Sequence, residues 1–180
     1  MPYTPDIHHR HSIRLKDYDY SRPGAYFVTI CAWQRECIFG DVANGEMVLN
    51  DVGRVVQAEW HRLPGRFPQI ELDMFVIMPN HFHGIINIVG AQFIALGMCG
   101  RDVKGAMNRA PTVGEMVRTF KARCTHAINI LRNNAGCPVW QRNYYERVIR
   151  NEKELSLARE YIVNNPMKWD RDRENPVNVV

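Results

Sequence analysis

Two histidines one residue apart, His81 and His83, lie in an apolar run, residues 74–88, that has the composition of β-strands. Alternate residues of a strand share a face, so both imidazoles point the same way and Phe82 points to the opposite face, where it can pack. Such a pair can bind a divalent metal ion. The turn signal Pro79-Asn80 precedes it, so we expect both histidines at an edge open to solvent and substrate. The alternative is one structural and one surface histidine.

The last predicted helix, residues 152–164, carries the groups that the histidine pair lacks. Tyr161 lies at the margin of an apolar stripe that includes Ile162, and Asn165 follows one turn later on the same side. Tyr161 offers a phenol as nucleophile, and Asn165 offers an amide oxygen as third ligand. The alternative is a packing tyrosine and an asparagine that ends the helix before Pro166.

The elements that must position these groups follow from periodicity and turn residues. One antiparallel sheet covered by helices is predicted, in the order β-α-β-β-α-β of the ferredoxin-like (RRM-like) α+β fold. We expect a central strand at 25–33, a hairpin at 38–50 about Asn44-Gly45, a helix from the N-cap Asp51 to about Leu63, strands at 70–78 and 81–89, a helix after the capping box Thr112/Glu115, a strand or two short strands at 139–149, and the final helix capped by Asn151. Residues 90–111, with Gly97, Gly100 and Gly105, are predicted to be a mobile loop.

Length and composition exclude several classes of protein. The 180 residues suit one domain with its own core. Five cysteines with no C-x-x-C pair indicate neither a disulfide framework nor a zinc knuckle, so we expect a reducing cytoplasm. The polar N-terminus and the lack of a long apolar run predict no export and no membrane span. No G-x-x-x-x-G-K-[ST] loop for ATP is present.

Basic residues gather in several clusters beside aromatic ones, although the net charge is only +4. Guanidinium groups neutralise phosphates and aromatic rings stack on bases, a combination that suits single-stranded nucleic acid. The alternative is an ordinary solvated surface. The candidate DNA contacts are Arg14, Arg118, Lys121, Arg123, Arg142, Tyr144, Arg147 and Arg150.

Three separated motifs resemble the REP-associated tyrosine transposases, a branch of the single-tyrosine HUH transposases. They are M-P-N-H-x-H-G-I-I, V-W-Q-R-N-Y-Y-E-R-V-I-R-N-E and E-Y-I-x-N-N-P-x-K-W, and the likeness runs from about His11 to Trp169. It implies an HUH endonuclease domain that nicks and rejoins single-stranded DNA beside a short hairpin, through a 5′-phosphotyrosine. We divide the chain into a basic N-terminal arm (1–24), the HUH transposase domain (25–169) and a C-terminal tail (170–180).

By position, the resemblance implies that His81, His83 and Asn165 bind Mg²⁺ or Mn²⁺ and that Tyr161 is the nucleophile. Many relatives have glutamine where this chain has Asn165, and the shorter side chain demands a closer helix end. A homodimer is compatible with the sequence, as is a monomer. Two rival functions remain open: a non-catalytic module that binds hairpin DNA or RNA, and a metal-dependent hydrolase whose base could be Asp73.

Overall fold

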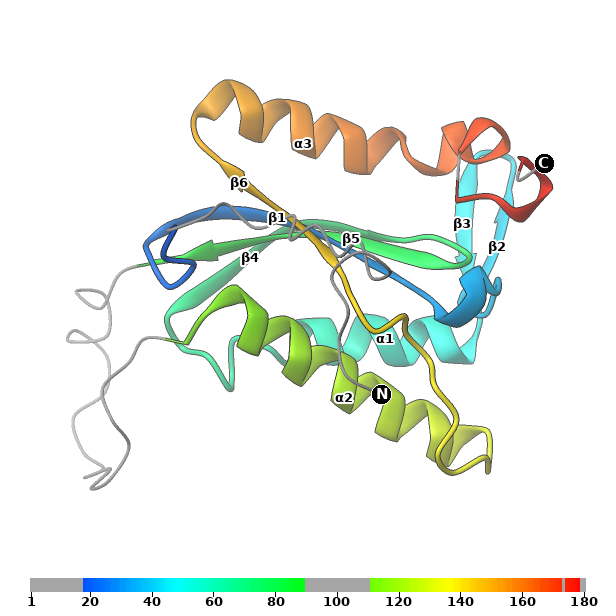
Figure 1. Cartoon of the computed structure of the whole chain (residues 1–180). Coiled ribbons are helices and arrows are strands. Elements are labelled where there is room, and N and C mark those ends of the chain that lie inside the picture. The colour runs from blue at the N-terminus through cyan, green and yellow to red at the C-terminus, as the bar shows by residue number, and fades with distance from the viewer. Residues whose placement is uncertain (1–17, 90–110, 173, 179–180) are drawn as a thin grey trace, which may run out of the picture.

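The computed structural model describes residues 18–89, 111–172 and 174–178 (Figure 1). The expected β-α-β-β-α-β order is present. It consists of β1 (Gly24–Cys31), α1 (Asp51–His61), β4 (Ile70–Ile77), β5 (His81–Ile88), α2 (Val113–Leu131) and β6 (Tyr145–Ile149). The predicted hairpin is β2 (Gly40–Ala43) and β3 (Glu46–Leu49), and α3 (Glu152–Asn164) follows β6. The predicted loop at 90–111 lies, except for Pro111, outside the described residues.

The four-stranded sheet has the order β4-β5-β1-β6, with every neighbouring pair antiparallel. This is the ferredoxin-like arrangement that the sequence predicted, with β1 and β5 in the centre. The register aligns Thr29 with His83 across β1 and β5, and Thr29 with Tyr145 across β1 and β6. Three residues from three strands therefore meet in one row across the sheet.

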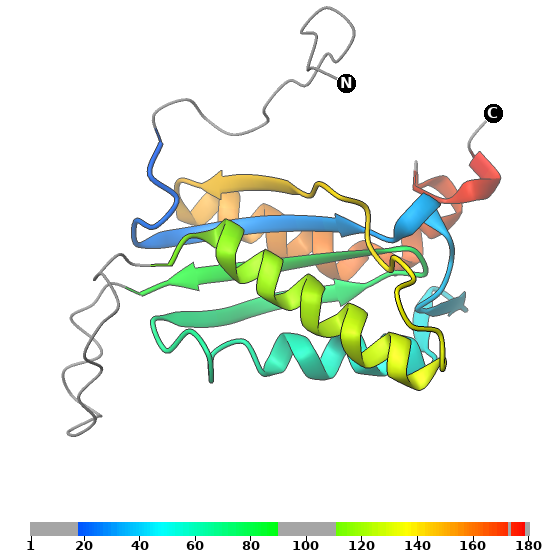
Figure 2. The same ribbon diagram turned by 60° about the horizontal axis from the view of Figure 1, so that its bottom comes forward.

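Helices α1 and α2 cover one face of the sheet (Figure 2). Even-numbered residues of β1 and β5 point to this face, and Phe82 is fully buried there, as predicted. Its ring lies 4.7 Å from that of Trp60 on α1 and 5.2 Å from that of Phe120 on α2, measured between centroids. Gly84 leaves room for Trp60, because a Cβ there would come within 2.7 Å of Trp60 Cζ2.

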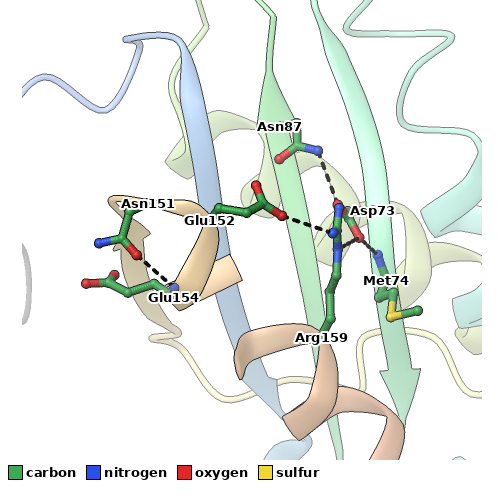
Figure 3. Close-up of polar contacts among 7 residues, drawn as sticks. All are labelled: Asp73, Met74, Asn87, Asn151, Glu152, Glu154 and Arg159. Atoms are coloured by element: carbon green, nitrogen blue, oxygen red, sulfur yellow. Dashed lines mark hydrogen bonds and ion pairs between the residues drawn. The ribbon is translucent and has the colours of Figure 1, made fainter. Parts of the chain in front are cut away.

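Helix α3 lies on the opposite face (Figure 1). A smaller apolar cluster of Ile85, Ile149 and Ile162 holds it there. Arg159 of α3 also donates to both carboxylate oxygens of Asp73 on β4, at 3.0 and 2.7 Å (Figure 3). Apolar packing and a bidentate ion pair thus hold the helix that carries Tyr161 over the face of the sheet that carries the histidines.

Several local predictions are confirmed and others are wrong. The capping box of Thr112 and Glu115 and the N-cap of Asn151 are present. The N-cap of α1 is Asn50, whose side chain accepts from Gly53 N, and not Asp51; the helix ends at His61 rather than near Leu63. Of the predicted strand at 139–149, only Tyr145–Ile149 pairs continuously, and Trp140 forms an isolated bridge with Ala32.

Some residues on either side of the predicted domain, 25–169, also have defined structure. Tyr18 and Tyr20, assigned to the N-terminal arm, pack on the core near Tyr26, and Val113 N donates to Tyr20 O. After α3 the chain turns into a 3₁₀ helix, Pro166–Arg171, and a second short one, Pro176–Asn178. Residues 174–178 of the predicted tail are therefore folded. No helix in the described part of the chain combines the length and apolar character that a membrane span requires.

Candidate active site

His81 and His83 lie side by side on the face of β5 that α3 covers. Their ring centroids are 4.6 Å apart, which confirms the shared face. The prediction that both histidines lie at an edge open to solvent is wrong, because 0% of the surface of His81 and 4% of that of His83 is exposed. The reason is that β5 is a central strand, while α3 and the residues after it lie over its first residues. His83 still lines a pocket, whereas His81 is enclosed.

The Nδ1 atom of each imidazole has a hydrogen-bond partner. His81 Nδ1 lies 2.9 Å from Asn80 Oδ1, and His83 Nδ1 lies 2.8 Å from Thr29 Oγ1. The Nε2 atoms of both rings are buried and have no hydrogen-bond partner among the described residues. Both rings therefore have the arrangement of metal-binding histidines, in which one nitrogen is held by a protein group and the other is available.

Helix α3 brings Tyr161 and Asn165 to the same place. The Tyr161 ring lies 5.2 Å from the His83 ring and 6.0 Å from the Phe27 ring, measured between centroids. Tyr161 is 44% exposed, whereas Asn165 at the helix end is 2% exposed. Asn165 Oδ1 is buried and has no hydrogen-bond partner in the part of the chain that the structure describes. One rigid element thus presents a reachable phenol and a buried amide oxygen.

The donor atoms fit a divalent cation. Among the described residues, six buried side-chain polar atoms lack a partner, and those suited to accept are His81 Nε2, His83 Nε2 and Asn165 Oδ1. Burying such atoms unpaired is costly, and a cation bound between them would remove that cost. The described residues contain no group of three or more His, Cys, Asp or Glu side chains that could hold a metal ion, so a third donor beside the two histidines would be the neutral amide of Asn165. Three neutral donors leave the cation its full charge and open positions for phosphate oxygens.

Burial determines the protonation states at the site. Desolvation lowers the pKa of His81 to about 4 and that of His83 well below its usual 6.5, so both rings are neutral at pH 7. Desolvation likewise raises the pKa of the Tyr161 phenol. The site therefore holds two neutral imidazoles and a protonated phenol, and the phenol needs a nearby positive charge to ionise at neutral pH.

Two pockets meet at the tyrosine. One has a volume of about 750 Å³ and the other about 410 Å³; both are lined by Thr29, His83, Tyr145 and Tyr161. Lys168 and Arg171 line the larger pocket and Arg147 lines the smaller one. Tyr161 and His83 therefore lie where the two pockets meet, whereas His81 lines neither pocket.

The candidate DNA contacts on and near β6 lie close to this junction, but in different ways. Arg147 lies 3.6 Å from the Glu154 carboxylate at the mouth of the smaller pocket. Tyr144 packs against the core, donates to Glu146 Oε2 at 2.7 Å and lines the larger pocket. Tyr145, 47% exposed, lines both pockets. Arg142 and Arg150 are exposed and line two other pockets.

The candidates on α2 lie on the other side of the sheet from Tyr161. Arg123 is paired with the buried carboxylate of Glu59, and Lys121 Nζ donates to the carbonyls of Gln141, Arg142 and Asn143. Arg118 is exposed on the same helix. Arg14 lies outside the described residues. The structure therefore does not bring the three side chains on α2 to the site. Contact of these three and of Arg14 with DNA stays a prediction.

The site contains residues that the sequence did not single out as functional. Asn80 was interpreted only as a turn residue, yet it is fully buried and contacts His81. Its position directly before the first histidine is the signal that could have indicated it. Thr29 carries no such signal, because only the pairing of β1 with β5 places it beside His83. Lys168 and Arg171 had been noted only as part of a basic cluster.

Comparisons with known proteins support the fold and do not identify the activity of this chain. No family model matches the chain. A protein of Haemophilus influenzae, described as uncharacterized, is 45% identical over 177 residues, covering 95% of this chain and 96% of that protein. The chain therefore belongs to the same family as the Haemophilus protein.

Among solved structures, a REP-associated tyrosine transposase bound to a REP hairpin matches with a TM-score of 0.57. The two chains are 19% identical, and the match covers 86% of this chain and 73% of the other. The chain thus has the fold of that transposase, as the sequence motifs predicted.

Proposed function

We propose that this chain is a metal-dependent single-stranded DNA endonuclease and strand transferase, a single-tyrosine HUH transposase that nicks and rejoins DNA beside short hairpins. The observation that carries the proposal is the meeting of Tyr161 with three unpartnered acceptor atoms, His81 Nε2, His83 Nε2 and Asn165 Oδ1. The match in fold to a transposase bound to a REP hairpin supports hairpin DNA as the substrate class.

The reaction consists of two transesterifications. The Tyr161 phenol loses its proton and its oxygen attacks phosphorus; a tyrosine–phosphorus bond forms, the bond from phosphorus to the 3′-oxygen breaks, and that oxygen leaves as a hydroxyl after taking up a proton. The product is a 5′-phosphotyrosine. A second 3′-hydroxyl then attacks the same phosphorus and releases Tyr161. The covalent bond conserves the phosphodiester energy, so no ATP is needed.

His81, His83 and Asn165 would hold the cation, Mg²⁺ or Mn²⁺. When bound, the cation supplies Lewis-acid stabilisation of the phosphate and favours the phenolate of Tyr161. The residues around it perform the positioning: α3 sets the phenol beside His83, and the wall formed by Thr29 and Tyr145 leads a strand towards the phenol. Arg147 on one side and Lys168 and Arg171 on the other would neutralise phosphates flanking the scissile one.

The hydrolase alternative loses its candidate base. Asp73 accepts two hydrogen bonds from Arg159 and one from Met74 N, and the bond from Arg159 is the main reason that its pKa lies below the usual value (Figure 3). A carboxylate so occupied is a poor proton acceptor. The three-acceptor arrangement likewise favours chemistry over a module that only binds hairpins.

The test is covalent capture. The protein is incubated with Mn²⁺ and a pool of hairpin oligonucleotides with randomised single-stranded flanks, with perfect duplexes as the control substrate, and the adduct is mapped by peptide mass spectrometry. We expect an adduct on Tyr161 that is absent in EDTA and in Tyr161→Phe. An adduct on Tyr144 or Tyr145 would overturn the assigned nucleophile. Hairpin binding without any adduct would favour the non-catalytic module.

A further inference from the structure

The side chain of Asn80 connects His81 to two distant parts of the chain. It is fully buried, and its Nδ2 donates to the carbonyls of Arg35 at 2.9 Å and Glu174 at 2.6 Å. Its Oδ1 lies 2.9 Å from His81 Nδ1. All the hydrogen-bonding groups of this amide are thus engaged, by the segment after β1, by the segment after α3, and by the first histidine.

These contacts determine which nitrogen of His81 carries the proton. Only the NH₂ end of an amide can donate, so the two carbonyls fix Nδ2 towards Arg35 and Glu174 and leave Oδ1 facing the imidazole. Oδ1 can only accept, so His81 Nδ1 must be the protonated nitrogen. Nε2, the other nitrogen, then presents a lone pair, and no described residue hydrogen-bonds to it.

The segment after α3 contributes to this arrangement. Glu174 Oε2 lies 3.1 Å from Arg35 Nε, and Glu174 N donates to Asp172 Oδ1 at 2.8 Å. These two contacts fix the position of the residue whose carbonyl accepts from Asn80. The same chain end follows directly from α3, the helix that carries Tyr161 and Asn165. The proposed nucleophile Tyr161 and the proposed third ligand Asn165 therefore lie in the chain shortly before Glu174, whose carbonyl holds Asn80.

We propose that Asn80 is a positioning residue: held by the carbonyls of Arg35 and Glu174, it fixes the ring and the tautomer of His81 so that Nε2 binds the cation. The inference rests on the proposed function, because it concerns the same metal site. It assigns a role in cation binding to the carbonyl of Glu174, in the segment that the sequence divided off as a tail.

The first test needs no variant, metal or DNA. Nitrogen-15 NMR of the imidazole rings in the wild-type protein at about pH 8 reports which nitrogen is protonated. We expect His81 to be protonated at Nδ1 and bare at Nε2. A proton on Nε2 overturns the inference.

The second test measures Mn²⁺ affinity without DNA, by electron paramagnetic resonance of the free ion. Losing a group that orients a metal-binding histidine typically costs 10- to 100-fold in metal affinity, so Asn80→Ala should raise the Kd for Mn²⁺ by about that factor and abolish the single tautomer of His81. The matched control is Asn129→Ala on α2, which also removes an amide that donates to a carbonyl, that of Cys137 at 3.0 Å, but on the other side of the sheet. We expect the control to bind Mn²⁺ as the wild type does.

The outcomes separate this inference from the proposed function. Unchanged Mn²⁺ affinity in Asn80→Ala, or an equal loss in Asn129→Ala, overturns the positioning role even if the wild type forms its covalent adduct. A wild type that binds Mn²⁺, shows the Nδ1–H tautomer, loses affinity in Asn80→Ala and yet forms no adduct supports the positioning role and sinks the proposed function.

Discussion

Burial of the two neutral histidines should make the metal-free protein sensitive to mild acid. His81 has a pKa of about 4 in the folded chain and an ordinary value of 6.5, so the unfolded state binds more protons than the folded state between these values. The stabilisation is complete above pH 6.5 and is lost as pH falls towards 4. Between about pH 8 and pH 5, His81 alone should cost about 2 kcal/mol of unfolding free energy, and His83 adds to the loss in the same direction.

The assay is urea unfolding of the protein in EDTA at about pH 8 and pH 5. In His81→Gln, which cannot take up this proton, the loss between the two pH values should shrink by about 2 kcal/mol. His126→Gln, which alters an exposed ring on α2, is the matched control and should leave the loss as in the wild type. If His81→Gln shows the full wild-type loss, His81 is not the group that titrates, and the lowering of its pKa by burial is refuted.

Three further predictions concern DNA binding and the fold. Arg147→Ala should lower the salt dependence of hairpin binding by roughly one unit of slope, and Arg118→Ala should lower it less, because Arg118 lies across the sheet from Tyr161; titrations at several salt concentrations decide this. Glu59→Gln should cost about 1–3 kcal/mol of unfolding free energy, measured by urea, because a buried acceptor of two arginines loses its charge, while adduct formation by the folded protein should persist. Gly84→Ala should cost about 1–3 kcal/mol in the same assay, because its Cβ would meet Trp60 at 2.7 Å; unchanged stability would show that the ring moves aside freely.

The sequence alone determined the helices and strands of the fold and which residues of a strand lie on the same face of the sheet. Periodicity of two placed His81 and His83 on one side of β5 and Phe82 on the other. The capping box of Thr112 and Glu115 located the start of α2, and the Asn44-Gly45 pair, at φ of 53° and 77°, located the hairpin turn. These features could be predicted because each depends on residues at most a few positions apart, whose geometry is set by backbone sterics and local hydrogen bonds.

Only the tertiary structure decided how the candidate residues are used. The two histidines look like an exposed strand start in sequence, but α3 and the C-terminal 3₁₀ turns bury them. Tyr144 and Tyr145 are adjacent and alike in sequence, yet Tyr144 packs on the core and lines only the larger pocket, whereas Tyr145 is exposed and lines both pockets. Arg123 lies in a basic cluster, and its partner Glu59 lies 64 residues away on another helix.

The role of Asn80 shows the physical reason most clearly. The partner that orients its amide is the carbonyl of Glu174, 94 residues further along the chain. A backbone carbonyl is present in every residue, so no side-chain pattern distinguishes the one that Asn80 contacts. Its identity follows from the strand order, from α3 lying across the sheet, and from the direction in which the chain leaves α3. Local patterns therefore indicated the candidate metal ligands and the candidate nucleophile. Long-range packing decided which groups contact them and which of the candidate residues line the pockets.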